Sequence, residues 1–233
     1  CRSIGALSCC SSSSNCRHIA APVAAFKTAA PRLPSASADR PRAHLAAMAA
    51  ASGDASKTVL VPAADGTEDM ELVIVVDVLR RAGAAVTVAS VKPGSLQVTL
   101  ARGCKLEADA LISDVKGTTF DLIACPGGMP GAEHLRDCTE LEAMLKAQRD
   151  GGRLYAAICA TPVVFFLPSG LLDGAKATSH PAFSDKLPDQ SVVGERVIVD
   201  GNLTTSRGPG TAFEWALSLV KQLYGQEKME AVA

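Results

Sequence analysis

The stretch LYAAICATPVVFFL, residues 154–167, decides how this chain is interpreted. Its apolar start over residues 154–160 predicts a central β-strand, and Cys159 stands where that pattern turns toward a helix. Thr161 and Pro162 follow, and proline is favoured in the first turn of a helix. A structural thiol could lie anywhere in such an apolar run, whereas a catalytic thiol would lie at the junction between strand and helix. Cys159 is therefore the first functional candidate.

From Lys57 onward, the segments around this stretch alternate between strand and helix patterns. Strands are predicted over residues 58–64, 85–90, 120–128 and 154–160, helices over 68–83, 141–152 and 211–225, and a hairpin over 195–206 with its turn at Asp200-Gly201 or Gly201-Asn202. Strands that are apolar throughout and separated by helices imply an α/β fold, with a mostly parallel sheet covered by helices on both faces.

Composition supports one domain over residues 57–233. The 233-residue chain is 48% hydrophobic, which suffices for a sizeable core, and it has no run of 18 apolar residues that would predict a membrane span. Residues 57–233 hold 17 basic and 22 acidic residues without a basic run, which argues against nucleic acid as a main ligand.

Residues 1–56 differ from the rest. They are rich in Ala and Ser, hold six basic and two acidic residues, and have no acid before Asp39. This composition predicts a transit peptide for a chloroplast or mitochondrion. A translated leader or low-complexity disordered segment is the alternative, and translation from Met48 would give a cytoplasmic protein.

The eight cysteines show no zinc-binding spacing and no disulfide framework, so we expect reduced thiols and no metal site. Cys104, Cys125 and Cys138 are expected to be mainly structural. For Cys159, a helix N-terminus would stabilise the thiolate and lower the thiol pKa from about 8.5. Such a strand–nucleophile–helix turn is a nucleophile elbow. The alternative is a small buried apolar side chain.

Glu71 is the best candidate partner, because it lies in the first turn of the helix predicted over residues 68–83. It is either a third acidic residue that favours the helix dipole, after Glu68 and Asp69, or a carboxyl group facing the thiol. In the second case the two groups would share a proton and act as nucleophile and general acid/base.

The remaining candidates are weaker. The loop CPGGMPG, residues 125–131, is either part of an oxyanion hole or a plain turn. His180 matters only if the chain returns it to Cys159. Arg102 and Arg207 would each bind an anion or pair with an acid.

Several of these stretches together resemble the DJ-1/PfpI family, in particular its Parkinson-disease deglycase branch and the plant and algal members. The similarity covers residues 57–230. The matching stretches are GTEDMELVIVVDVLRRAGAAVTVAS (66–90), FDLIACPGGMPGA (120–132), LYAAICATP (154–162), ATSHP (177–181) and LTTSRGPGTAFEWAL (203–217).

The resemblance implies a flavodoxin-like α/β sandwich that forms a homodimer. It also implies the roles of single residues: Cys159 as nucleophile and Glu71 as its protonated partner. The anion and substrate pocket would use Gly127, Gly128 and Ala160 with Arg102 nearby, and His180 would be an acid/base.

Three residues depart from the family pattern. Ala160 follows Cys159 where the protease-like branch has histidine, Thr161 replaces a smaller residue, and Met129 follows the glycine pair. Many plant relatives also have two tandem domains; this sequence shows one, and truncation of a second is the alternative.

The resemblance therefore predicts a cofactor-independent glyoxalase, acting on small aldehydes, with deglycase activity on glycated proteins. The alternative is a thiol-based redox sensor or chaperone in oxidative-stress defence, and a cysteine peptidase is the weakest candidate.

Overall fold

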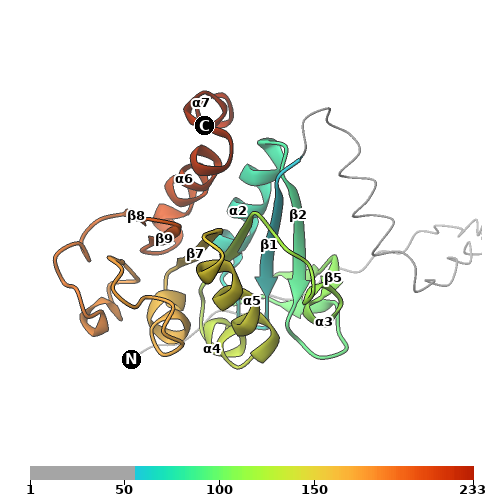
Figure 1. Ribbon diagram of the computed structural model, residues 1–233. Coiled ribbons are helices and arrows are strands. Elements are labelled where there is room, and N and C mark those ends of the chain that lie inside the picture. The colour runs from blue at the N-terminus through green and yellow to red at the C-terminus, as the bar shows by residue number, and fades with distance from the viewer. Residues whose placement is uncertain (1–55) are drawn as a thin grey trace, which may run out of the picture. The chain divides into compact units, whose positions relative to one another are not determined.

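The computed structural model describes residues 56–233 (Figure 1). The leader predicted over residues 1–56, with Met48 in it, lies outside the described residues except for Ser56. The strands are β1 (Thr58–Ala63), β2 (Ala85–Ser90), β3 (Gln97–Thr99), β4 (Lys105–Glu107), β5 (Ala110–Leu111), β6 (Leu122–Cys125), β7 (Leu154–Ile158), β8 (Val197–Asp200) and β9 (Leu203–Ser206). The α-helices are α2 (Asp69–Arg81), α3 (Ile112–Val115), α4 (Gly131–Arg136), α5 (Thr139–Asp150), α6 (Ala212–Tyr224) and α7 (Gln226–Val232).

Seven of these strands form one sheet in the order β5-β2-β1-β6-β7-β9-β8. All neighbours pair in parallel except β8 and β9, which form the antiparallel hairpin at the edge. From β1 the chain first builds the sheet toward β2 and β5, and then toward β6, β7 and β9. The reversal places a topological switch point between β1 and β6, where ligands bind at the carboxyl ends of the strands.

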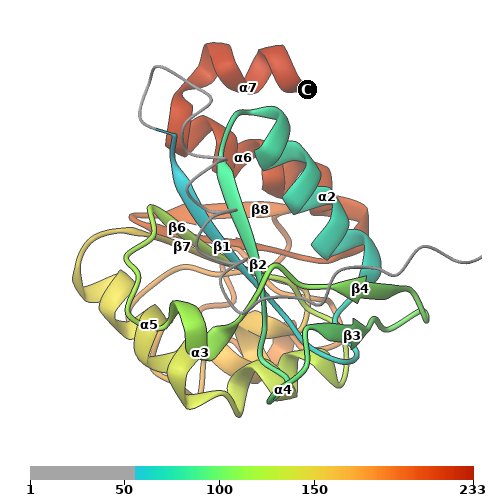
Figure 2. The same cartoon turned by 90° about the vertical axis from the view of Figure 1, so that its right-hand side faces the viewer.

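Helices cover both faces of this sheet, as the sequence pattern predicts. Helices α2, α6 and α7 lie on one face and α3, α4 and α5 on the other (Figure 2). Successive residues of β1 serve the two cores: Val59 and Val61 belong to the same buried cluster as Trp215 of α6, whereas Leu60 belongs to the cluster of Leu141 of α5. Burial on both faces explains why the strands are apolar throughout.

The predicted elements are present, with shifted ends. The hairpin turns at Gly201-Asn202, where Gly201 has φ +58°. The strand predicted over residues 120–128 ends at Cys125, because Pro126 has no N–H to continue the ladder and the glycines form a loop. The β3–β4 hairpin, the short strand β5 and the helices α3, α4 and α7 were not predicted. Among the described residues, no helix is long and apolar enough to cross a membrane.

Candidate active site

Cys159 follows the last residue of β7 and sits on a strained turn. Its φ is +66°, the one positive φ of a non-glycine residue in the described part of the chain. This left-handed conformation costs about 1–2 kcal/mol for a residue with a Cβ. Two backbone hydrogen bonds hold it in place: the Cys159 N–H donates to Ser206 O at 3.0 Å, and the Cys159 O accepts from His180 N at 2.8 Å. The predicted elbow is therefore present.

The helix after the elbow differs from the prediction. A π-helical turn, Pro162–Phe166, follows Cys159, so the sulfur does not face the N-terminus of a long α-helix. Thr161 is fully buried, and its hydroxyl donates to Pro126 O at 2.6 Å. That hydrogen bond ties the elbow to the glycine loop after β6.

Glu71 is fully buried in the first turn of α2. The N-cap residue Glu68 accepts the Glu71 N–H at 2.8 Å. Oε2 of Glu71 accepts a 2.7 Å hydrogen bond from Gly127 N, whereas Oε1 has no hydrogen-bond partner among the described residues. A buried carboxyl oxygen without a partner is costly unless a ligand or proton uses it.

Glu71 and Cys159 each shift the pKa of the other, so they titrate as a pair. Burial raises the pKa of Glu71 to about 7, against the lowering effect of the Gly127 N–H. Burial also raises the pKa of the Cys159 thiol to about 12, and the charge of Glu71 adds to that rise. The prediction that the elbow lowers the thiol pKa is wrong in direction, because desolvation outweighs the N–H groups of Gly128 and Ala160.

A thiolate at this site therefore requires that Glu71 carry the proton. Protonation of Glu71 removes the charge that opposes ionisation of Cys159, and it leaves the N–H groups of Gly128 and Ala160 as stabilising dipoles near the sulfur. These two N–H groups are the ones that the family resemblance implies for the anion pocket.

Gly127 has a different role from the predicted one. Its N–H is used by Glu71 and is not free for an oxyanion. A Cβ at this position would lie 2.6 Å from Cys159 Cβ and 2.9 Å from Glu71 Oε2. Gly127 therefore allows the thiol and the carboxyl to approach each other.

The structure also brings His180 to the site. The backbone N–H of His180 donates to Cys159 O. Its ring atom Cδ2 lies 3.4 Å from the position that a Cβ on Gly208 would occupy. The same Gly208 position is 4.0 Å from Oε1 of Glu71. Nδ1 of His180 accepts the Ala182 N–H at 3.2 Å, so we assign the proton of the neutral ring to Nε2.

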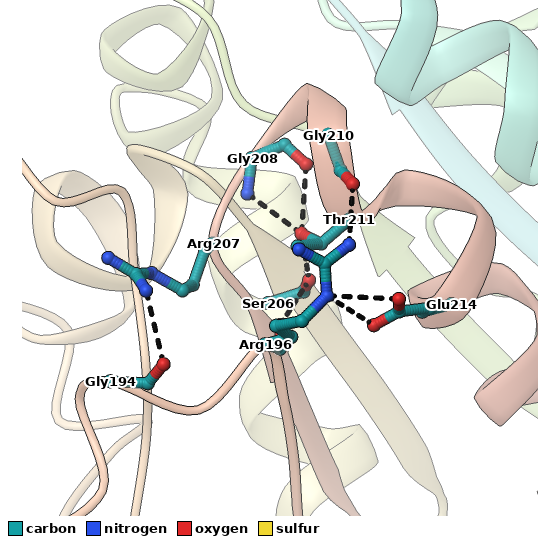
Figure 3. Close-up of polar contacts among 8 residues, drawn as sticks. All are labelled: Gly194, Arg196, Ser206, Arg207, Gly208, Gly210, Thr211 and Glu214. Carbon is teal, nitrogen blue, oxygen red and sulfur yellow. Dashed lines mark hydrogen bonds and ion pairs between the residues drawn. The ribbon is translucent and has the colours of Figure 1, made fainter.

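The two arginine candidates, Arg102 and Arg207, each have a hydrogen-bond partner in the structure. Arg102 is exposed, and its backbone N–H donates to Asp69 at 2.8 Å; a role for its side chain stays a prediction. Arg207 donates from Nη1 to Gly194 O at 3.1 Å, so its partner is a carbonyl oxygen and not an acid (Figure 3).

The other cysteines are separate from the site. Cys125 and Cys138 are buried, whereas Cys104 is exposed, so the expectation of a packing role is wrong for Cys104. All four cysteines within residues 56–233 are free thiols, and no three His, Cys, Asp or Glu side chains there are placed to share a metal ion.

Sequence reasoning missed Gly208, which reaches the site from the turn after β9, and Thr211, which holds Gly208 there. Glycine and threonine are common in turns, so their presence here does not by itself predict a functional role. The glycines in GPGT, residues 208–211, were the available hint, because glycine allows the backbone to approach other side chains closely.

A cysteine on a strained elbow beside a buried carboxyl, at the carboxyl ends of a mostly parallel sheet, defines a nucleophile-elbow α/β protein. Comparison with known proteins specifies the family. The DJ-1/PfpI family model matches residues 57–222, and the chain belongs to this family. The flavodoxin-like fold implied by the sequence is thereby confirmed.

Three relatives show how far the similarity extends. Protein DJ-1 homolog B of Arabidopsis thaliana is 51% identical over 73% of this chain, and the match covers only 39% of that relative's length. Glutathione-independent glyoxalase DJR-1.2 of Caenorhabditis elegans is 37% identical over 76% of this chain and 93% of its own. The structure of oxidized Toxoplasma gondii DJ-1 has a TM-score of 0.74 and 47% identity, covering 76% of this chain and 96% of that one.

Proposed function

We propose that this protein is a cofactor-independent glyoxalase that converts methylglyoxal to lactate, and glyoxal to glycolate. The observation that carries the proposal is the buried Glu71, held through Oε2 and free at Oε1, beside the thiol of Cys159. The name of the nematode relative, a glutathione-independent glyoxalase, supports the same reaction.

The first step is attack on the aldehyde. The Cys159 thiolate, formed with Glu71 protonated, adds to the aldehyde carbon to give a hemithioacetal. The N–H groups of Gly128 and Ala160 lie near the sulfur and stabilise the negative charge on the former aldehyde oxygen. That oxygen then takes the proton held by Glu71, which completes the hemithioacetal and leaves Glu71 ionised.

The second step moves a proton between neighbouring carbons. Glu71, after losing its proton, removes the C–H proton of the hemithioacetal through Oε1, and an enediol forms. Return of the proton to the adjacent carbon gives a thioester, with His180 assisting at the oxygens. Water hydrolyses the thioester, releasing lactate and the Cys159 thiol. Overall, one molecule of methylglyoxal and one of water are converted to one molecule of lactate.

Lactate production from methylglyoxal, without glutathione, tests this proposal directly. Wild-type protein and Cys159→Ala are compared, with Cys125→Ala as a control that removes a buried thiol outside the site. We expect turnover in the wild type and in Cys125→Ala, and none in Cys159→Ala. Absence of lactate with folded wild-type protein would reject the glyoxalase proposal.

Deglycation would begin with the same attack on a glycated protein, so it is a second use of the site. A redox sensor or chaperone is the alternative function. The solved oxidized form of Toxoplasma gondii DJ-1 favours it. A cysteine peptidase is disfavoured, because Ala160 stands where the protease-like branch has histidine.

The assembly we propose is a homodimer. Met70 and Val73 on α2 and Phe213 on α6 are each more than half exposed, and α2 and α6 pack against each other. Large apolar side chains exposed on adjacent helices are typical of an interface between subunits. We further propose that residues 57–233 form the functional domain and that residues 1–56 direct it to a chloroplast or mitochondrion, with a cytoplasmic form starting at Met48.

A further inference from the structure

The turn after β9 lies against the candidate site. It contains Gly208 and the short 3₁₀-helix Pro209–Thr211 (Figure 3). A Cβ on Gly208 would lie 3.4 Å from His180 Cδ2 and 4.0 Å from the unpartnered Oε1 of Glu71. Gly208 is buried. The backbone at Gly208 therefore forms a wall of the site between the candidate acid/base residues.

Thr211 holds this wall through its side chain. Its Oγ1 accepts the Gly208 N–H at 3.1 Å, and Gly208 O accepts the backbone N–H of Thr211 at 2.8 Å. The same Oγ1 also lies 2.6 Å from Oγ of Ser206. Thr211 is 6% exposed, so water does not replace these contacts.

Ser206 connects the same hydroxyl pair to the elbow. Its Oγ donates to Arg196 O at 2.8 Å, and its backbone O accepts the N–H of Cys159 at 3.0 Å. One residue therefore links the backbone of the nucleophile with the side chain that holds Gly208. Buried hydroxyl networks of this kind rigidify a site when all members are satisfied.

An ion pair holds the turn from its exposed side. Nε of Arg196 donates to both carboxylate oxygens of Glu214, at 2.9 and 2.8 Å, and Nη2 donates to Gly210 O at 2.8 Å (Figure 3). The hydroxyl contacts lie inside the turn and the ion pair outside it. The position of Gly208 is thus fixed from two sides.

We infer that Thr211 is a positioning residue, whose hydroxyl holds Gly208 against His180 and keeps water off the free oxygen of Glu71. The expected effect of Thr211 on kcat rests on the proposed function. The expected effect of Thr211 on the titration of Glu71 is measurable without turnover. The ionisable groups that face Glu71 are Cys159, Glu68 and His180, and Thr211 contacts none of them directly. Its action is through the Gly208 wall.

The test compares Thr211→Val, which keeps the shape and removes the hydroxyl, with Thr211→Ser, which keeps the hydroxyl. Thr139→Val is the matched control, because the hydroxyl of Thr139 is exposed and bonds only to Glu140. The carboxyl ¹³C resonance of Glu71, identified by its loss in Glu71→Gln, is titrated in the full chain. The values of kcat and KM for methylglyoxal are measured alongside.

In Thr211→Val, we expect Glu71 to titrate at a pH about one unit lower than in the wild type, because water reaches it. We also expect kcat to fall about tenfold with little change in KM. Thr211→Ser and Thr139→Val should behave as the wild type. An unchanged Glu71 titration in Thr211→Val, or an equal change in Thr211→Ser, would overturn the inference.

If Thr211→Val does not fold, Glu214→Gln is used in its place, because loss of the Glu214 charge loosens Arg196 at the surface. A smaller shift of the Glu71 titration in the same direction supports the inference. An unshifted titration overturns it. If the wild type produces no lactate, the proposed function fails, while the titration of Glu71 still decides the role of Thr211.

Discussion

The N–H of Gly127 donates to Oε2 of Glu71 at 2.7 Å, and the second oxygen of that carboxyl has no partner among the described residues. One hydrogen bond therefore orients the group, and the other oxygen remains open toward Gly208. A general acid/base needs both properties, a fixed direction and an atom free to exchange a proton.

Burial of Glu71 makes stability depend on pH. Its pKa rises from 4.5 to about 7 in the folded protein, so the native state binds more protons than the unfolded chain between these values. Stability from this group is full below pH 4.5 and is lost as the pH rises through 7, on the order of 3 kcal/mol in total.

Urea unfolding of wild type and Glu71→Gln across this range measures the effect. The free energy of unfolding of the wild type should fall relative to that of Glu71→Gln as the pH rises. The difference between the two proteins removes the contribution of other ionisable groups. A difference that is constant with pH would contradict the raised pKa.

Gly127→Ala should damage both fold and site. The added Cβ would lie 2.6 Å from Cys159 Cβ and 2.8 Å from Ile158 O, so backbone must move. We expect a loss of about 1–3 kcal/mol in stability and at least a hundredfold loss in kcat/KM. Gly117→Ala is the control, because a Cβ there has no neighbour within 4 Å. Equal behaviour of the two variants would refute the close approach.

The strain at the elbow predicts an unusual order of stability. With φ at +66°, Cys159→Gly should be more stable than Cys159→Ala by about 1 kcal/mol, because glycine adopts this conformation without a Cβ clash. Thermal or urea unfolding of both variants measures the difference. Greater stability of Cys159→Ala would show that the left-handed backbone is not retained.

The proposed dimer interface predicts a surface substitution with a large effect. Val73→Glu places a charge on α2 beside Met70, whereas Val199→Glu places the same charge on β8 at a similarly exposed valine. Sedimentation velocity should show a dimer for the wild type and Val199→Glu, and a monomer for Val73→Glu. A monomeric wild type, or a dimeric Val73→Glu, would exclude this interface.

The sequence was informative where the chemistry depended on local pattern. Cys159 was predicted because an apolar strand ends at it and a proline follows, and Glu71 because a carboxyl group opens an apolar helix. The strand and helix order followed from the same periodicity. A strand-rich core with apolar residues at every position leaves few arrangements other than a covered parallel sheet.

Features that depend on distant segments were not predictable. The use of the Gly127 N–H by Glu71, and the approach of Gly208 to both Glu71 and His180, arise only after β1, β6, β7 and β9 pair. The direction of the Cys159 pKa was missed for the same reason. The local turn suggested stabilising dipoles, whereas burial by the whole domain outweighs them.

The most direct test of the account is the comparison of lactate formation with thiol reactivity in Glu71→Gln. Glutamine keeps the shape of the side chain but cannot transfer a proton. We predict that lactate formation from methylglyoxal falls at least a hundredfold, while iodoacetamide still alkylates Cys159. If Glu71→Gln retains wild-type turnover, Glu71 is not the proton-transfer group and the central claim is wrong.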